Sequence, residues 1–399
     1  MKKENKNLKS IMISGYFGFD NCGDEAILMA MIQELAGSLP LENIVVLSHS
    51  PQQTKEKYGV NAIPRLNIFS IISHLKKTAV FVSGGGGLLQ DVTGKGLSIF
   101  YYIGLILLAR FLKVPGVFFA QGVGPVRKKI NQKLIRMALN KIELILVRDE
   151  YSQQFLLELG IQKESVLLCA DPSFLLKKEK LPAHIVERYQ LNSKSDKQTP
   201  DRRIGLVIRN SKEIKNDYEQ KISQLGEIAD YLIEKQQSDL FFFPFQPADD
   251  MTLINDIKEK IYHSNHSLVS CFCDDLNPAQ MLSLFSKVSL VIGMRLHAII
   301  FATICNTPFV AIDYDPKVRN YVDSLGLPEL LLKVNQLSVK NIADKLKYIK
   351  NNEDTIKSVL NSAVKEYQQR ADNGMKRLIS FIEDRELNLM AGKESKNLD

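Results

Sequence analysis

The 399-residue sequence has no tryptophan, only five cysteines and no long hydrophobic run. The cysteines are scattered, and Cys271-Phe272-Cys273 lacks the C-x-x-C spacing of a zinc or redox site. An odd, scattered set excludes a disulfide framework, so we expect reduced thiols in a cytoplasmic protein. Without tryptophan, any stacking against a sugar ring must come from tyrosine or phenylalanine.

Apolar segments argue against a membrane-spanning or exported chain. The most hydrophobic stretch, residues 96–109, has 14 uncharged residues, whereas a membrane-spanning helix needs about 20. It predicts a buried helix, with a helix lying against a membrane as the alternative. The N-terminus is polar up to residue 10 and continues with three apolar residues, short of the roughly 7–15 in a signal peptide. A location at the inner face of the plasma membrane stays open.

The charge balance is mildly basic. Lys and Arg number 52 against 45 Asp and Glu, a formal net charge of +7, while 45% of residues are hydrophobic and 24% are charged. This composition is ordinary for a soluble globular protein and excludes disordered or collagen-like chains. The diffuse basic excess favours anionic small molecules or a membrane surface as partners over nucleic acid, which needs denser basic clusters.

Short β-rich runs alternate with helical patterns in two series, which predicts βαβ units and a parallel sheet in each series. In the first series, strands are expected at 10–14, 44–48, 79–83, 116–120, 144–147 and 166–169, and helices at 25–38, 97–112, 131–141 and 152–159. In the second series, strands are expected at 204–208, 239–244, 267–271, 290–292 and 309–312, and helices at 218–236, 251–262, 278–286 and 296–305.

A polar, lysine-rich stretch, residues 177–203, separates the two series and predicts a linker. We therefore expect an α/β protein with an N-terminal Rossmann-like domain at 10–176, a second Rossmann-like domain at 204–335 and a C-terminal helical tail at 336–388. The two domains are expected to face each other across a cleft. In such sheets, ligands bind at the C-terminal ends of the strands.

Two glycine-rich segments follow predicted strands. Residues 15–25, GYFGFDNCGDE, lead into a helix whose N-terminal amides can hold an anion, and a plain turn with Asp24 as helix N-cap is the alternative. Residues 84–91, GGGGLLQD, favour close approach to a ligand over an ordinary strand end. The first segment does not match the G-x-G-x-x-G fingerprint, and the second does not match Walker A.

A third segment, QGVGP at 121–125, precedes a basic helix. No acidic residue occurs there before Glu143, and the cations are Arg127, Lys128, Lys129, Lys133 and Arg136. This pattern is typical of a solvated helix face. It also suits attraction to a phosphorylated lipid or an anionic membrane.

Cations also follow later strands. Arg148 and Arg209 each close a predicted strand, so they point toward the cleft or pair with a carboxylate such as Asp149. Lys317, in the segment 313–317, adds a cation at the same rim or forms an ordinary loop salt bridge.

The sharpest candidate is GMRLH at 293–297, where a strand ends and a helix begins. Arg295 supplies a planar fork for a carboxylate or phosphate. His297 can exchange protons near neutral pH. A capping histidine in a polar loop is the alternative. No group of His, Cys, Asp and Glu has metal-binding spacing, and no G-x-S-x-G supports a serine hydrolase.

The ordered segments GYFGFDNCGDE, GGGGLLQD, QGVGP, VRD, GMRLH and YDPK resemble the polysaccharide pyruvyl transferase family, most closely its CsaB-type cell-wall branch. The resemblance covers residues 11–317. It implies a fold similar to GT-B glycosyltransferases, phosphoenolpyruvate as donor substrate, a sugar as acceptor and a ketal-linked pyruvate as product. It implies neither a metal nor an organic cofactor.

By this resemblance, His297 matches the family's proposed general acid, and Arg295, Arg148 and Lys317 match basic residues that hold phosphoenolpyruvate. The other substrate-binding residues that we expect are Arg209, Asn21, Gly23, Asp24, Glu25, Gly85, Gly86, Asp91 and Gln121.

Three positions depart from the family's pattern. Cys22 and Gly87 stand where Thr and Ser are commoner, and Arg209 is followed by Asn210-Ser211 where related sequences often have an aromatic residue. Stacking of the acceptor sugar is therefore not expected from this last segment.

The implied chemistry fits the residues. We expect His297 to protonate the methylene carbon of phosphoenolpyruvate while Arg295 neutralises the charge. The acids that could position or deprotonate sugar hydroxyls are Asp24, Glu25, Asp91 and Asp149. The acceptor is a sugar of a cell-wall or surface polysaccharide precursor, and its linkage to a lipid stays open. The alternatives are a GT-B glycosyltransferase that uses a nucleotide sugar, and a non-catalytic glycan-binding protein of the same fold.

Overall fold

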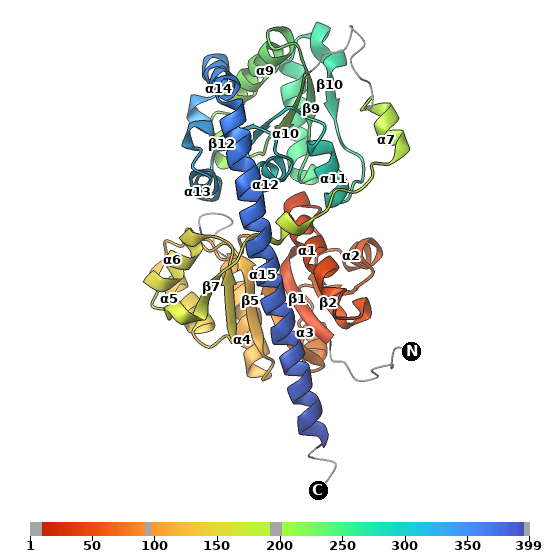
Figure 1. Ribbon diagram of the computed structural model, residues 1–399, viewed down its shortest axis with the longest axis vertical. Coiled ribbons are helices and arrows are strands. Elements are labelled where there is room, and N and C mark those ends of the chain that lie inside the picture. Colours follow the sequence, from red (N-terminus) through yellow and green to blue (C-terminus); the bar gives the residue numbers. More distant parts are fainter. Residues whose placement is uncertain (1–9, 92–96, 192–201, 395–399) are drawn as a thin grey trace. The chain divides into compact units, whose positions relative to one another are not determined.

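The computed structural model describes residues 10–91, 97–191 and 202–394. They form two compact units, each built on its own parallel sheet (Figure 1). Within these ranges, unit 1 comprises residues 10–19, 24–176 and 367–394, and unit 2 comprises residues 20–23 and 177–366. By its contacts, the short segment after the first strand thus belongs to unit 2.

Unit 1 contains a seven-stranded sheet in which neighbouring strands run parallel. Its strands are β1 (Ser10–Phe17), β2 (Ile44–Ser48), β3 (Asn61–Pro64), β4 (Thr78–Gly84), β5 (Gly116–Gln121), β6 (Leu144–Val147) and β7 (Val166–Leu168). Their order is β3-β2-β1-β4-β5-β6-β7. Every residue of β2 and β4 is buried, as expected for a parallel sheet covered on both faces.

Helices cover both faces of this sheet. They are α1 (Cys22–Leu35), α2 (Pro51–Tyr58), α3 (Ile68–Leu75), α4 (Leu97–Phe111), α5 (Lys129–Leu139), α6 (Glu150–Glu158) and the C-terminal part of α15 (Glu353–Glu394). One core joins α3, α4 and α5, and the other joins α1 and α15. Figure 1 shows α15 crossing the strands of unit 1. Gly374 permits this approach, because a Cβ there would lie 2.7 Å from Cβ of Cys169.

Unit 2 contains a six-stranded parallel sheet of order β10-β9-β8-β11-β12-β13. Its strands are β8 (Arg202–Val207), β9 (Ser238–Phe242), β10 (Val269–Cys271), β11 (Leu290–Gly293), β12 (Phe309–Asp313) and β13 (Leu331–Lys333). Its helices are α7 (Ala183–Arg188), α8 (Lys212–Asn216), α9 (Tyr218–Glu234), α10 (Pro247–Lys260), α11 (Pro278–Phe285), α12 (Leu296–Ile304), α13 (Pro316–Ser324) and α14 (Val339–Asn351).

Short 3₁₀ turns complete the connections. They lie at Leu41–Asn43, Lys163–Ser165, Pro172–Leu175, His263–Leu268, Pro328–Leu330 and Val334–Gln336.

A phenylalanine cluster fixes the loop between β9 and α10. Phe245 packs against Phe285 and Phe301 with ring centroids 5.8 and 5.7 Å apart, and Phe285 and Phe301 meet edge to face at 5.5 Å. All three rings are fully buried. Because aromatic cores of this kind are rigid, the residues just after Phe245 are held in one position at the end of the strand.

Both sheets reverse their strand order at one point, between β1 and β4 in unit 1 and between β8 and β11 in unit 2. Ligands of doubly wound sheets bind at such a reversal, outside the C-terminal strand ends. The glycine-rich segments follow β1 and β4, and Arg209 and Arg295 follow β8 and β11. The prediction of two Rossmann-like α/β domains and a helical C-terminus is confirmed.

The structure also contains elements that the apolar patterns do not predict. They are α2, β3, α3, α7, α8, α13 and β13. Helix α7 lies inside the expected linker 177–203, of which residues 192–201 fall outside the described part of the chain. The expected tail 336–388 is divided, because α14 belongs to unit 2 whereas Met375, Leu378 and Ile382 of α15 enter a core of unit 1.

The most hydrophobic stretch of the sequence forms α4. Ile99, Ile103 and Ile106 are buried in the core beneath it, which confirms the expected buried helix. Phe100 and Phe111 on its outer side are 50% and 82% exposed. Among the described residues, no helix is both long and apolar enough to cross a membrane.

Candidate functional site

Arg295 is held by a buried ion pair in unit 2. The side chain follows β11 and stands at the N-cap position of α12, where its backbone is extended. Its Nη2 donates to Oδ1 of Asp250 at 2.6 Å, and Nη1 lies 3.5 Å from Oε1 of Gln246. Arg295 is 6% exposed and Asp250 is fully buried. Arg295 Nε has no hydrogen-bond partner within the described part of the chain, so one donor of the fork remains unused.

The carboxylate behind Arg295 is strongly desolvated. Burial raises the pKa of Asp250, although the Arg295 guanidinium and the backbone N–H of Gln246, which donates to Oδ2 at 2.9 Å, favour its charged form. A buried carboxylate of this kind is tolerated only beside a matching cation. The loop that carries Gln246 and the first turn of α10 therefore set the position of the arginine.

His297 lies in the first turn of α12 against residues 20–23. Asn21 Oδ1 accepts from the Gly23 N–H at 3.1 Å, and the Cys22 N–H donates to the Phe245 carbonyl at 2.7 Å. A Cβ on Gly23 would overlap the His297 imidazole. Glycine is therefore required at this position for the close approach, and the segment fixes one side of the ring. The predicted residues Asn21, Gly23, Arg295 and His297 come together in unit 2.

Arg209 occupies the neighbouring strand end. It follows β8, which pairs directly with β11, and its Nη1 donates to the Tyr314 hydroxyl at 3.1 Å. The guanidinium also lies 5.7 Å from the centroid of the Tyr314 ring. Its direct hydrogen-bond partner is this phenol, while the carboxylates of Asp250 and Asp315 attract the guanidinium from a longer range. Arg209 and Arg295 thus stand at the reversal point of one sheet.

Lys317 forms the loop salt bridge that was one of the two interpretations of segment 313–317. Lys317 Nζ lies 3.4 Å from Oδ2 of Asp315. Oδ1 of Asp315 accepts from the Lys317 N–H at 3.1 Å, which caps α13. A further cation, Arg319, binds Asp313 Oδ2 through Nε and Nη2 at 2.8 and 2.6 Å. No motif in the sequence marks Arg319, which lies in the first turn of α13.

Arg148 forms the corresponding buried cation of unit 1. It follows β6, and its Nη1 donates to Asp171 Oδ2 at 3.1 Å while Nε lies 3.5 Å from Asp149 Oδ2. A Cβ on Gly122 would lie 2.7 Å from Nη2, so this glycine makes room for the guanidinium. Two carboxylates thus neutralise Arg148, as its structural interpretation expects. A role in holding substrate stays a prediction.

Glycines 85 and 86 have a packing reason. Their φ angles are +69° and +74°, values that other residues rarely adopt. A Cβ on Gly85 would overlap Ile27, and one on Gly86 would lie 2.7 Å from Oδ1 of Asp24. The close packing of this loop on α1 is enough to require both glycines, without any ligand. The same packing places Asp24 beside Gly86.

Two predicted polar residues of unit 1, Glu25 and Gln121, hold local structure. Glu25 accepts from the Gly18 N–H at 2.7 Å and from the Tyr58 hydroxyl at 2.6 Å, and burial raises its pKa. Gln121 Nε2 donates to the Ser83 carbonyl and hydroxyl at 2.7 and 2.8 Å. These contacts organise the turn after β1 and join β5 to β4.

Asp91 organises the start of the basic helix. Its oxygens accept from the N–H groups of Arg127 and Lys128, both at 2.8 Å, and from Asn131 Nδ2 at 3.0 Å. Desolvation works against the charged form, but these hydrogen bonds prevail and lower the pKa of Asp91. A carboxylate held ionised in this way is a poor general base, so the structure favours a capping role for Asp91.

Unit 1 contains an aromatic cluster that is not predicted from the sequence. Phe19 stacks with Tyr16 and His49 at centroid distances of 4.1 and 4.3 Å. The Arg65 guanidinium lies 5.0 Å from the Phe19 centroid and 4.5 Å from that of Tyr101. We call these five side chains the aromatic cluster. They come from the ends of β1, β2 and β3 and from α4, and this spacing explains why no sequence motif marks them.

Within the described residues, no group of three or more His, Cys, Asp and Glu could hold a metal ion. The arrangement in unit 2 instead offers two arginines, an imidazole and a helix N-terminus at one strand edge. Such a set can bind a small anion and transfer a proton to it.

Comparison with known proteins points in the same direction. A family model for polysaccharide pyruvyl transferases matches residues 21–316. The amylovoran biosynthesis protein AmsJ of Erwinia amylovora is 23% identical over 276 residues, which cover 65% of this chain and 64% of that protein. The match thus spans less than two thirds of the relative's length.

Two solved structures with similar folds illustrate the comparison. A Listeria monocytogenes protein described as a UDP-N-acetylglucosamine 2-epimerase has a TM-score of 0.64 at 10% identity over 94% of this chain and 97% of its own. S. aureus MnaA, solved with UDP, has a TM-score of 0.62 at 13% identity, covering 94% and 96%. At such identities the likeness shows the GT-B-type fold alone.

Proposed function

Because the chain belongs to the polysaccharide pyruvyl transferase family, we propose that it transfers the pyruvate unit of phosphoenolpyruvate to a sugar of a cell-wall or surface polysaccharide precursor. The product is a pyruvate ketal, and phosphate is released. The observation that carries the proposal is the convergence of Arg209, Arg295 and His297 at the reversal point of the unit 2 sheet.

The charges suit a small dianion or trianion. Asp250 neutralises much of the Arg295 charge, so Arg295 contributes geometry through its fixed fork and its unused Nε–H. Arg209 adds a second cation, whose direct hydrogen-bond partner is the Tyr314 phenol and which shares the attraction of Asp250 with Arg295. The N-terminus of α12 adds a further positive field. Phosphate and carboxylate groups of phosphoenolpyruvate are the anions that this set would bind.

The reaction balances without an oxidant or reductant. Protonated His297 gives its proton to C3 of phosphoenolpyruvate, and C2 becomes an oxocarbenium-like centre. One sugar hydroxyl attacks C2 and loses its proton, the bond between C2 and the phosphate oxygen breaks, and phosphate leaves. A second hydroxyl then attacks C2, loses its proton and closes the ketal. Of the two protons that the hydroxyls release, one restores protonated His297 and the other leaves with phosphate. The sugar loses two hydrogens and gains the three carbons of pyruvate.

Residues 20–23 position the acid. Gly23 packs directly against the His297 ring, and the Cys22 N–H anchors this segment to the Phe245 carbonyl. A ring fixed in one orientation directs its proton to one point, which is the requirement for protonating a carbon atom.

The aromatic cluster supports the acceptor side of the proposal. Sugar rings present C–H faces that stack on aromatic rings, and this chain has no tryptophan to supply one. Phe19 and His49 stack at the C-terminal strand edge of unit 1, the edge at which doubly wound sheets bind ligands. We therefore assign the acceptor sugar to this cluster.

The test is incubation with phosphoenolpyruvate and synthetic ManNAc- or galactose-containing acceptors. The expected results are release of phosphate only when acceptor is present, and an acceptor mass gain equal to pyruvate minus water. His297→Ala should lower kcat by about 10²–10⁴-fold, whereas His263→Ala, on an exposed 3₁₀ turn of unit 2, should leave it unchanged. Near-normal turnover of the His297 variant would exclude the assigned acid.

A nucleotide-sugar glycosyltransferase is the second candidate, because similar folds have been solved with UDP. Turnover of UDP-sugars with no response to phosphoenolpyruvate would select it. Binding of glycans without release of phosphate or UDP would select a non-catalytic protein.

A further inference from the structure

One face of unit 1 combines exposed apolar side chains with unopposed positive charge. The face is formed by α3, α4, α5 and their adjoining turns, residues 65–77, 97–115 and 126–142, and we call it the cationic face. The three helices cover the same side of the sheet and share one core (Figure 1). Helix α4 packs against α5, and α3 and α4 both pack on β4.

The apolar side chains of this face are unusually accessible. Among the described residues, it holds seven of the nine exposed large hydrophobic side chains. Leu66, Phe69 and Phe111 are 77%, 84% and 82% exposed. The other four are Ile68, Phe100, Ile130 and Met137. Such a concentration marks an interaction surface, because soluble monomers rarely leave a large apolar patch in water.

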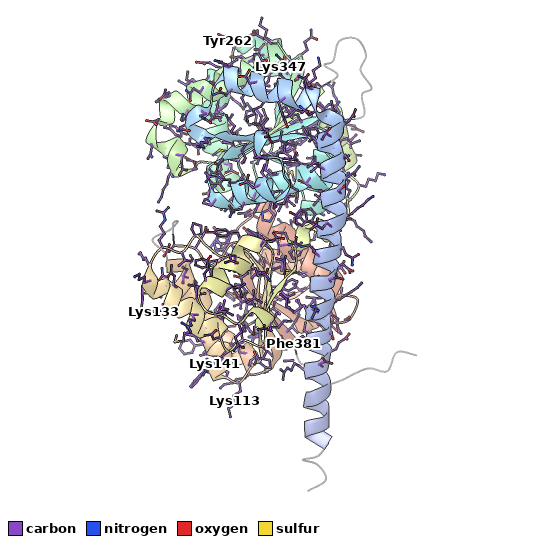
Figure 2. The ribbon with its side chains drawn as sticks, turned by 60° about the vertical axis from the view of Figure 1, so that its left-hand side comes forward. Lys113, Lys133, Lys141, Tyr262, Lys347 and Phe381 are labelled. Atoms are coloured by element: carbon purple, nitrogen blue, oxygen red, sulfur yellow. The ribbon has the colours of Figure 1, made fainter. Side chains whose placement is uncertain are left out.

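The charge of the face has one sign. Its three segments contain 11 of the 52 lysines and arginines and none of the 45 aspartates and glutamates. The rest of the chain therefore has 41 cationic residues against 45 acidic ones. The cations of the face are Arg65, Lys76, Lys77, Arg110, Lys113, Arg127, Lys128, Lys129, Lys133, Arg136 and Lys141. All of them except Arg65 are exposed, and Figure 2 shows Lys113, Lys133 and Lys141 pointing away from unit 1.

We propose that this face docks on the surface of an anionic lipid bilayer. A bilayer offers phosphate groups for the lysines and arginines and an acyl layer for the phenylalanines and aliphatic side chains. A second copy of the chain would bring like charges together. A nucleic acid would satisfy the cations but leave Leu66, Ile130 and Met137 without an apolar partner. Only the bilayer matches both properties of the face.

The face extends to the strand edge that carries the aromatic cluster. Arg65 and Tyr101 belong to the cluster, and Leu66 and Phe100, their neighbours in sequence, belong to the exposed apolar set. An acceptor sugar linked to a lipid would therefore find the cluster beside the membrane surface. This part of the inference rests on the proposed function, whereas docking on the bilayer does not.

Cosedimentation of the full chain with vesicles tests the docking. Vesicles of phosphatidylglycerol and phosphatidylcholine in equal amounts are compared with vesicles of phosphatidylcholine alone, without phosphoenolpyruvate. We expect binding to the anionic vesicles only, weakened by salt because surface charge attraction is screened. Equal binding to both vesicles, or binding to neither, would overturn the proposal.

Two variant pairs separate the contributions. The first variant carries Lys129→Glu and Lys133→Glu in α5 and Lys141→Glu in the turn after it, and we call it the α5 variant. It should lower the partition coefficient at least about a hundredfold, since each cation near an anionic surface contributes separately. The matched control, Lys340→Glu/Lys347→Glu/Lys350→Glu, makes the same charge change on exposed lysines of α14 and should bind as before. Phe111→Ser should lower binding about tenfold. Tyr262→Ser, at an exposed site of unit 2 (Figure 2), should not.

The outcomes also distinguish this inference from the proposed function. Loss of binding in the α14 control as large as in the α5 variant would show that net charge and not this face is responsible. A dimer in sedimentation velocity that the Phe111 variant dissociates, with no vesicle binding, would assign the face to a second copy. Turnover with a water-soluble acceptor should be unchanged in the α5 variant. Vesicle binding by a chain that shows no pyruvyl transfer would uphold docking and overturn the function.

Discussion

The buried Arg295–Asp250 pair allows stability and function to be separated. Asp250 is completely buried, with an exposed fraction of 0%, and its carboxylate lies 2.6 Å from Nη2 of Arg295. Asp250→Asn keeps an oxygen for the Gln246 N–H, which donates at 2.9 Å, but removes the charge. A guanidinium that is 6% exposed then lacks its counterion. Breaking such a pair costs about 3–5 kcal/mol.

The size of the loss follows from the dielectric of the site. Two unit charges about 4 Å apart attract by about 4 kcal/mol at an effective dielectric constant of about 20. Arg295→Met should cost a similar amount, because it leaves the Asp250 carboxylate buried alone. The double variant removes both charges, so it should recover about 2 kcal/mol relative to the sum of the single losses.

Urea unfolding followed by circular dichroism measures these differences, since the chain has no tryptophan for fluorescence. Phosphate release from phosphoenolpyruvate measures function. We expect the double variant to regain stability and to remain inactive, because the cation proposed to hold phosphoenolpyruvate is then absent. Additive losses in the double variant, or a cost below about 1 kcal/mol for Asp250→Asn, would refute the buried pair. Turnover in the double variant would refute a functional role for Arg295.

Three further outcomes follow. Gly23→Ala should lower kcat by about a hundredfold, because a Cβ there overlaps the His297 ring and displaces it; an unchanged kcat in a folded variant would contradict this packing. Phe19→Ala should raise the acceptor KM about tenfold and leave the KM of phosphoenolpyruvate unchanged, and an equal rise in both would show general damage. Burial raises the pKa of Glu25 above its usual range, so its folded form holds the proton more tightly than the unfolded chain. The stability of the wild type relative to Glu25→Gln should therefore increase as pH falls from 7 through the folded pKa; urea midpoints measured across this range that show no such increase would contradict it.

Fold class is readable from the sequence because two series of buried strands dominate it. The predicted strands 44–48 and 144–147 coincide with β2 and β6, which are short apolar runs bounded by turn residues. In contrast, β3 is four residues long, ends in Pro64 and buries only its two central residues. Its pairing with β2 depends on the sheet and not on its own pattern.

The cations of the candidate site can be predicted from the sequence, but the residues that hold them cannot. The GMRLH segment identifies Arg295 and His297 because a strand end and a helix start are both local signals. Asp250 lies 45 positions away on α10, and its burial beside Arg295 depends on how that helix packs. The same holds for Gly122 and Arg148. A glycine that suggests a ligand loop in sequence proves to make room for a guanidinium.

Net charge therefore describes the surface of this protein and not its binding site. The two most deeply placed arginines, Arg148 and Arg295, are each matched by a buried carboxylate, so neither contributes to a net excess. The excess of +7 is smaller than the 11 cations of the cationic face. A basic sequence with paired arginines inside is what an enzyme needs if it must hold a small anion in a fixed geometry and also attract an anionic surface. The first task requires orientation, which buried pairs supply, and the second requires unpaired charge, which only exposed lysines and arginines supply.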